Sequence, residues 1–166
     1  VTEHDLEQRR TERERSRVTS AHARSWQLVS ALRTEDFDVA HLGRADQVVL
    51  DLEDAVDDSL KQRARDHVHT WLAGGGRAWV RVNDVTTPFW SDDLSMLVDS
   101  PGVAGVVLAK TESPGHVTVT HQRLGGAVPV IALVESALGI EEATAIARAE
   151  GTHRLAFGSG DYRKDT

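Results

Sequence analysis

The stretch Val48-Val49-Leu50-Asp51-Leu52-Glu53-Asp54 is a short apolar run that ends in acidic residues. Its β-branched and almost uninterrupted apolar character is typical of a strand that is buried on both faces of a parallel sheet. Comparable runs recur at intervals of roughly 25 residues, the length of one strand–helix unit. Together with residues 47–52, the predicted strands are 26–29, 78–82, 103–109, 128–134 and 153–157.

Between these runs the apolar residues follow a helical period. Thr34 is the predicted cap of the first helix, and Asp57 or Asp58 that of the second, which the glycines at 74–76 end. The Val-Thr repeat at 117–120 weakens the fourth helix, whereas the fifth has a strong helical pattern. The helices are predicted over residues 34–45, 57–73, 88–98, 114–124 and 137–150.

The alternation of strands and helices predicts an α/β fold, a (β/α)8 TIM barrel that is incomplete here. Six predicted strands fall short of the eight that close such a barrel, which typically has about 250 residues. An open doubly wound sheet is the alternative, but Ser30–Arg33 is not the glycine-rich loop that usually follows the first strand of that fold. We therefore expect a barrel domain over residues 24–166 that lacks its C-terminal part or is covered by other chains.

Residues 1–23 are predicted to form a charged helical extension, with the helix over 2–22, because opposite charges stand three and four positions apart. We interpret this helix as solvated; packing against a neighbouring subunit is the alternative. The segment lacks the apolar centre of a signal peptide. No apolar run approaches the ~20 residues that span a membrane, so no membrane partner is expected and a cytoplasmic location is the default prediction.

The composition is that of a globular domain, with 40% hydrophobic and 27% charged residues. The net charge of −7 gives no reason to expect nucleic acid as a partner. The chain has no cysteine, which excludes disulfides, zinc–thiolate sites and cysteine nucleophiles. The histidines of the predicted helices are interpreted as surface residues rather than ligands: His41, His67, His69, His116 and His121.

Polar residues follow the predicted strands at their carboxyl ends, where barrels carry their chemistry. Buried charges are unfavourable unless they are paired or bind a metal, so the set favours a site over ion pairs at the rim. Glu135 and Asp161 end neighbouring strands, and their hard oxygens favour Mg2+ or Mn2+. In chain order the polar strand ends are Asp51, Glu53 and Asp54; Arg81, Asn83 and Asp84; Lys110 and Glu112; Glu135 and Ser136; and Ser159 and Asp161.

Six motifs, in order and at matching spacing, resemble the citrate lyase β-subunit-like family, also called the HpcH/HpaI aldolase/citrate lyase family. The resemblance runs from about Arg24 to the end of the chain. One motif lies on the helix after the second strand and comprises Lys61 with Ala64 and Arg65. The other motifs are 48–56, 80–83, 105–113, 131–139 and 155–161.

The resemblance implies a barrel that assembles as a homo-oligomer, a trimer or hexamer, with Mg2+ as its cofactor. It implies that Glu135 and Asp161 hold the metal and that Arg81 binds the carboxylate of a keto acid. Glu53 and Asp54 are implied to lie near the metal, and with Arg81 they form the predicted catalytic set.

Two further cations are predicted to contact the substrate. Arg33 stands in the loop after the first strand, and by the same resemblance we expect it to face the phosphates of coenzyme A. Lys110 ends the fourth strand and could form a Schiff base, as in metal-free aldolases. The neighbouring carboxylates favour the metal route instead, so we interpret Lys110 as an ion-pair partner or substrate contact.

The function implied is a Mg2+-dependent carbon–carbon lyase. Its substrate would be a hydroxyacyl-CoA of the citramalyl, malyl or citryl type, cleaved to an acyl-CoA and a keto acid or formed from them. Cleavage leaves an enolate whose charge a metal stabilises, and Arg81 would fix the pose by a bidentate bond to the carboxylate. The alternatives are a metal-dependent pyruvate aldolase that does not use coenzyme A and a non-catalytic barrel subunit.

Overall fold

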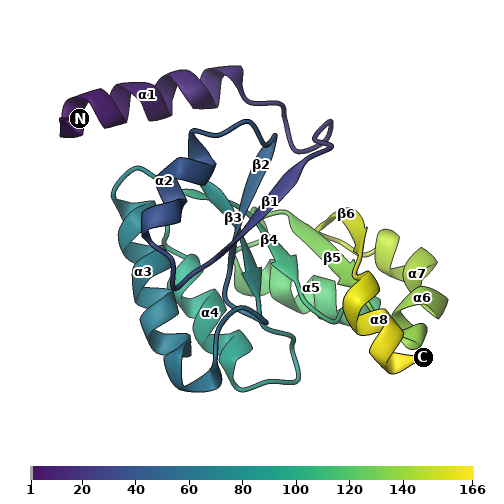
Figure 1. The fold of residues 1–166 in the computed structure, drawn as a ribbon. Coiled ribbons are helices and arrows are strands. Elements are labelled where there is room, and N and C mark those ends of the chain that lie inside the picture. The colour runs from purple at the N-terminus through teal and green to yellow at the C-terminus, as the bar shows by residue number, and fades with distance from the viewer. Residues whose placement is uncertain (1) are drawn as a thin grey trace.

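The computed structural model describes residues 2–166 and contains one sheet of six parallel strands in the order β1-β2-β3-β4-β5-β6. This confirms the predicted incomplete (β/α) barrel, because each strand pairs with the next along the chain and β1 does not pair with β6 (Figure 1). The predicted strands are correct to within two residues. Their bounds are β1 Trp26–Ser30, β2 Gln47–Asp51, β3 Ala78–Val82, β4 Val103–Leu108, β5 Val130–Val134 and β6 Thr152–Phe157.

Helices alternate with the strands, and local caps fix several of them. The Asp57 side chain accepts from the Ser59 N–H, and the Ser113 side chain accepts from the His116 N–H. Thr34 makes no such bond, so it is not the side-chain cap that was predicted. The elements are α2 Glu35–His41, η1 Asp58–Leu60, α3 Lys61–Ala73, α4 Phe89–Leu97, α5 Pro114–Arg123, α6 Ala137–Glu141, α7 Ala143–Ala147 and α8 Ser159–Asp165.

The single helix predicted over 137–150 is wrong, because the segment forms two short helices that meet at Glu142. Gly139 weakens the first turn, and its backbone lies so close to the Thr111 carbonyl that an added Cβ would be 2.8 Å away. This contact with the loop after β4 therefore places the segment. Gly151, with a φ of 92°, then reverses the chain into β6.

The N-terminal helix α1 (Glu3–Ser16) is shorter than the predicted 2–22. It has no buried residue and lies apart from the sheet (Figure 1), yet it is attached to the domain by arginine side chains. Arg10 contacts Asp38 at 2.7 Å and the Gly74 carbonyl at 2.7 Å, and Arg17 donates to the His41 carbonyl at 2.8 Å. None of the helices in residues 2–166 has the length and apolarity needed to span a bilayer.

Two apolar clusters cover the two faces of the sheet. The larger lies between the sheet and the helices and includes Leu50 and Val80. The smaller occupies the opposite, inner face and includes Val49 and Trp79. Since side chains alternate along a strand, Asp51 and Arg81 share that inner face, so the inner core leads directly to the predicted site.

The sheet is curled but open. Arg154 of β6 reaches the segment before β1 and donates to the Ser20 and Ala23 carbonyls at 2.9 and 2.8 Å. The two edge strands nevertheless keep apolar residues in contact with solvent, since Leu28 of β1 is 51% exposed and Phe157 of β6 is 57% exposed. One helical histidine departs from prediction, because His41 is fully buried.

Candidate metal and substrate site

The carboxyl ends of the strands bring most of the predicted polar residues together. Asp51 ends β2, Glu53 follows it, and Arg81 lies in β3 on the same face. Glu135 directly follows β5, and Lys110 stands two residues after the end of β4. The sixth strand differs from the prediction, because Ser159, Gly160 and Asp161 form the first turn of α8 rather than the end of the strand.

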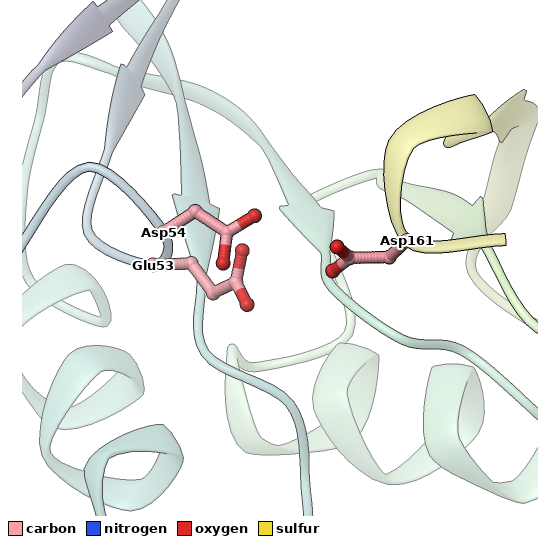
Figure 2. A group of neighbouring side chains, drawn as sticks. All are labelled: Glu53, Asp54 and Asp161. Carbon is pink, nitrogen blue, oxygen red and sulfur yellow. The ribbon is translucent and has the colours of Figure 1, made fainter. Parts of the chain in front are cut away.

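Three carboxylates form an acidic group at this end of the sheet. One oxygen each of Glu53, Asp54 and Asp161 lies within 4.8 Å of the others. Figure 2 shows the carboxylates of Glu53 and Asp54, in the loop after β2, directed toward that of Asp161 in the first turn of α8. Glu53 is buried, and its Oε2 atom accepts no hydrogen bond from residues 2–166. Its ion-pair partner is Arg81, whose Nη1 atom lies 3.4 Å away, and a buried carboxylate oxygen that accepts no hydrogen bond is suited to bind a cation.

Glu135, predicted as a metal ligand, is beside this group but is not one of its three members. Its Oε1 atom accepts the Lys110 backbone N–H at 2.9 Å. Burial raises the pKa of Glu135, and the nearby charges of Glu53 and Asp161 raise it further. Gly158 makes room for this side chain, because an added Cβ there would be 2.4 Å from Glu135 Oε2.

Arg81 is held by Asp51, a strand-end residue for which no role was predicted. The Nε and Nη2 atoms of Arg81 donate to the two Asp51 oxygens at 2.7 and 2.6 Å. The remaining nitrogen, Nη1, is 3.4 Å from Glu53 and 3.9 Å from Asp54. Burial alone would lower the pKa of Arg81, but the bonds and charge of Asp51 outweigh it and raise the pKa. The bidentate bond that Arg81 was predicted to make with the substrate carboxylate is therefore made with Asp51 instead.

Lys110 is an ion-pair partner of the acidic group, as predicted. Its ammonium donates to Glu53 and lies 3.5 Å from Asp161. Burial would lower the pKa of Lys110, but the hydrogen bond and charge of Glu53 outweigh it and raise the pKa. The amine therefore keeps its proton at neutral pH, which disfavours Schiff-base chemistry. Lys110 has a left-handed backbone conformation with a φ of 46°, and this conformation is uncommon for residues other than glycine.

Asp161 has the properties of an ionised ligand. A hydrogen bond from Lys164 holds the pKa of Asp161 below its usual range, and the charge of Lys110 lowers it further. Its side chain is 17% exposed, so it is accessible from solvent while remaining inside the group. Carboxylates that are already deprotonated bind divalent cations without a competing proton.

Arg33 does not join these residues. Its side chain is 64% exposed, and its Nε atom is paired with Asp36 at 2.8 Å. Asn83 is buried behind the site, where its Oδ1 atom accepts from Lys61 at 2.8 Å. The structural importance of Asp51 had one signal in the sequence, since this charged residue directly follows the apolar run 48–50 of a buried strand.

Comparison with known proteins identifies relatives over most of the chain. Residues 33–166 match the HpcH/HpaI aldolase/citrate lyase family. The citrate lyase subunit beta of Leuconostoc mesenteroides subsp. cremoris is 32% identical, over 73% of this chain and 45% of that protein. A citrate lyase subunit beta-like protein of Mycobacterium tuberculosis is 35% identical, over 82% of this chain and 47% of that protein. The chain thus spans about half the length of the curated relatives it matches.

Solved structures share the fold. CitE from Mycobacterium tuberculosis in complex with magnesium, acetoacetate and coenzyme A is similar with a TM-score of 0.76 and 32% identity, over 87% of this chain and 52% of that one. The citrate lyase beta subunit from M. tuberculosis with oxaloacetate and magnesium also has a TM-score of 0.76 and 32% identity, over 87% of this chain and 62% of that one. These relatives bind magnesium together with a keto acid.

Proposed function

The chain belongs to the HpcH/HpaI aldolase/citrate lyase family, and from this membership we propose that it acts as a Mg2+-dependent carbon–carbon lyase. The proposed substrate is a hydroxyacyl-CoA of the citramalyl, malyl or citryl type, cleaved to an acyl-CoA and a keto acid or formed from them. One observation carries the proposal: the carboxylates of Glu53, Asp54 and Asp161 meet the cations of Arg81 and Lys110 at the carboxyl end of the sheet.

The acidic group fits a magnesium ion. Its members offer hard oxygen ligands within 4.8 Å of one another, and the buried Glu53 Oε2 accepts no hydrogen bond from residues 2–166, its one ion-pair partner among them being Arg81 Nη1 at 3.4 Å. We propose that Asp161 and Glu135 would hold the ion, as the family resemblance implies, and that Glu53 and Asp54 would lie near it. A bound Mg2+ would supply Lewis-acid stabilisation of the negative charge that develops on the enolate fragment.

The two cations of the site have separate tasks in this proposal. Arg81 orients the carboxylate of the keto acid through Nη1, the nitrogen nearest Glu53 and Asp54, while Asp51 prevents the guanidinium from turning. Lys110 keeps its proton and acts as a fixed positive charge beside Glu53 and Asp161. Both groups are in place before substrate arrives, so little rearrangement is needed during the reaction.

The test is a cleavage assay on the longest natural form of the chain with citramalyl-, malyl- and citryl-CoA. We expect release of a keto acid from at least one thioester, dependent on Mg2+ and abolished by a chelator. The variant Asp161→Asn should lose at least about 100-fold in rate, because it removes a proposed ligand. The variant Asp165→Asn is the control, since this carboxylate is in the same helix but binds the Ala137 N–H outside the acidic group. Turnover of no thioester, or turnover without Mg2+, would contradict the proposal.

A pyruvate aldolase that does not use coenzyme A is the second candidate. The observation in its favour is that Arg33, the predicted phosphate contact, is already paired with Asp36. Competition with free coenzyme A separates the two functions. The lyase predicts inhibition by coenzyme A that weakens in Arg33→Ala, whereas the aldolase predicts no inhibition and cleavage of a 4-hydroxy-2-keto acid instead.

A further inference from the structure

Lys61, the first residue of α3, buries its ammonium directly behind the acidic group. Only 4% of the residue is exposed. Its Nζ atom donates to the carbonyls of Leu52 and Glu53 at 2.8 and 2.7 Å, and to Asn83 Oδ1 at 2.8 Å. All three donors of the ammonium are therefore used, and two of them hold the backbone of the loop that carries Glu53 and Asp54.

This buried cation has an unusual set of partners. Within residues 2–166 no carboxylate lies within ion-pair distance of Lys61, and its hydrogen-bond acceptors are all neutral. Burial accordingly lowers the pKa of Lys61. Burying a charge without a paired counter-ion is unfavourable; here the Phe89 ring at 5.5 Å and the charges of Asp93 and Glu53 offset part of that penalty.

The acceptor Asn83 connects Lys61 to a second helix. The Asn83 side-chain amide donates to Asp93 at 2.7 Å, and the Asn83 backbone N–H donates to the same carboxylate at 3.0 Å. Asp93 of α4 is fully buried and is paired with Arg65 of α3 at 3.1 Å. Lys61 and Arg65, which the proposed reaction does not use, are thus linked through Asn83 and Asp93 in one buried polar network. This network ends at the loop that carries Glu53 and Asp54.

The same loop is held from the other side by Asp51. The Asp51 carboxylate accepts the N–H groups of Glu53 and Ala55 at 2.9 and 3.1 Å. The backbone of Glu53 is therefore held at its N–H by Asp51 and at its carbonyl by Lys61. Fixing both ends of one residue restricts the direction in which its side chain leaves the backbone.

We propose that Lys61 is a positioning residue that fixes the Glu53–Asp54 loop and thereby sets the affinity of the acidic group for a divalent cation. The cation part of this inference rests on the proposed function, whereas the loop part does not. Residues that orient metal ligands from behind typically change metal affinity by about 10- to 100-fold when they are replaced.

The test compares Lys61→Met with Val68→Ala in the longest natural form of the chain. Val68 is fully buried in the same helix and has no part in the site, so its variant reports a loss of packing alone. Two quantities are measured: amide hydrogen exchange at Glu53, Ala55 and Val56, and Mg2+ affinity by calorimetry. We expect Lys61→Met to speed exchange at these amides and to weaken Mg2+ binding about 10- to 100-fold, with neither change in Val68→Ala.

A charge-rescue variant makes the test specific to the ammonium. Residues 1–166 contain no cysteine, so Lys61→Cys, with any cysteine outside these residues replaced by serine, can be alkylated in denaturant with bromoethylamine, which restores an ammonium, or with iodoacetamide, which adds a neutral group. The refolded aminoethyl form should recover slow exchange and Mg2+ affinity, and the neutral form should not.

The outcomes separate this inference from the function on which it rests. Exchange and affinity in Lys61→Met that match Val68→Ala overturn the inference, as does faster exchange with unchanged Mg2+ affinity. If the unmodified chain binds no Mg2+, the proposed function fails. The exchange data then decide the role of Lys61 in the loop: faster exchange that the aminoethyl form reverses supports it, and unchanged exchange overturns it.

Discussion

The inner face of the sheet has opposite chemistry at its two ends. At the amino ends of the strands it consists of packed rings, with Trp26 against Trp79 and Trp79 against His153 at centroid distances of 5.3 and 5.5 Å. At the carboxyl ends it consists of ions, beginning with the pair between Asp51 and Arg81. The same strands therefore have a packed end that contributes stability and a charged end that can carry chemistry. TIM barrels likewise have their active sites at the carboxyl ends of the strands and stabilising residues at the opposite end.

The packed end depends on one close approach. The ring of Trp79 lies over Gly105 of β4, where an added Cβ would be 2.2 Å from the indole. The indole N–H also donates to the Gln47 side chain at 3.2 Å. A glycine on the neighbouring strand is thus what allows a large ring to fill the inner face at this end.

The largest expected effect comes from breaking the ion pair at the charged end. Asp51→Ala removes the two short hydrogen bonds of the buried Arg81, leaving it only the longer contacts with Glu53 and Asp54, and removes the acceptor of two loop N–H groups. We expect a loss of about 3–5 kcal/mol in the free energy of unfolding, measured with urea. The double variant Asp51→Ala with Arg81→Met should recover part of that loss, because no unpaired charge remains. A single variant as stable as the unmodified chain would show that the pair is not structural.

A smaller effect is expected from loosening the packed end. Trp79→Phe removes the bond to Gln47 and part of the ring volume, which should lower the free energy of unfolding by about 1–2 kcal/mol. Mg2+ affinity of the folded protein, measured by calorimetry, should be unchanged, because the acidic group lies at the other end of the sheet. A loss of Mg2+ affinity in this variant would contradict the separation of the two ends.

The smallest expected effect is a pH dependence near the packed end. Burial lowers the pKa of His41, and the charge of Arg17 lowers it further, so the folded chain favours the neutral ring. The stability from the neutral ring is present above the unfolded pKa of about 6.5 and is lost as the pH falls below it. The slope approaches at most about 1.4 kcal/mol per pH unit. His41→Asn, which keeps a donor for the Arg77 carbonyl, should flatten the slope in urea unfolding between pH 7 and 5. An unchanged slope would show that other titratable groups cause the pH dependence of stability.

The strands and the position of the charged end could be predicted from the sequence, because buried parallel strands leave a direct signal. The uninterrupted apolar run 48–50 with acids after it predicts both the strand and the side on which Glu53 and Asp54 emerge. The helices were less predictable, since contacts between distant segments decide them. The break at Glu142 comes three residues after Gly139, whose backbone packs closely on the Thr111 carbonyl, a contact that no local pattern contains.

The details of the site depend on partners that spacing does not reveal. Arg81 was predicted from its strand-end position, but its binding to Asp51 required the register of β2 against β3. Glu135 was predicted as a metal ligand, but the carboxylates that cluster with Asp161 are those of Glu53 and Asp54. The role of Glu135 as a ligand stays a prediction. The homo-oligomeric state, trimer or hexamer, and the cytoplasmic location also stay predictions.

We propose above all that the charged end binds a keto acid through a divalent cation held by Asp161. The most direct measurement is calorimetric titration of oxaloacetate into the longest natural form of the chain, with and without Mg2+, beside Asp161→Asn. We expect binding that requires Mg2+ and is lost in Asp161→Asn. Binding that is equally tight without Mg2+ or in the variant, or no binding under any condition, would contradict it.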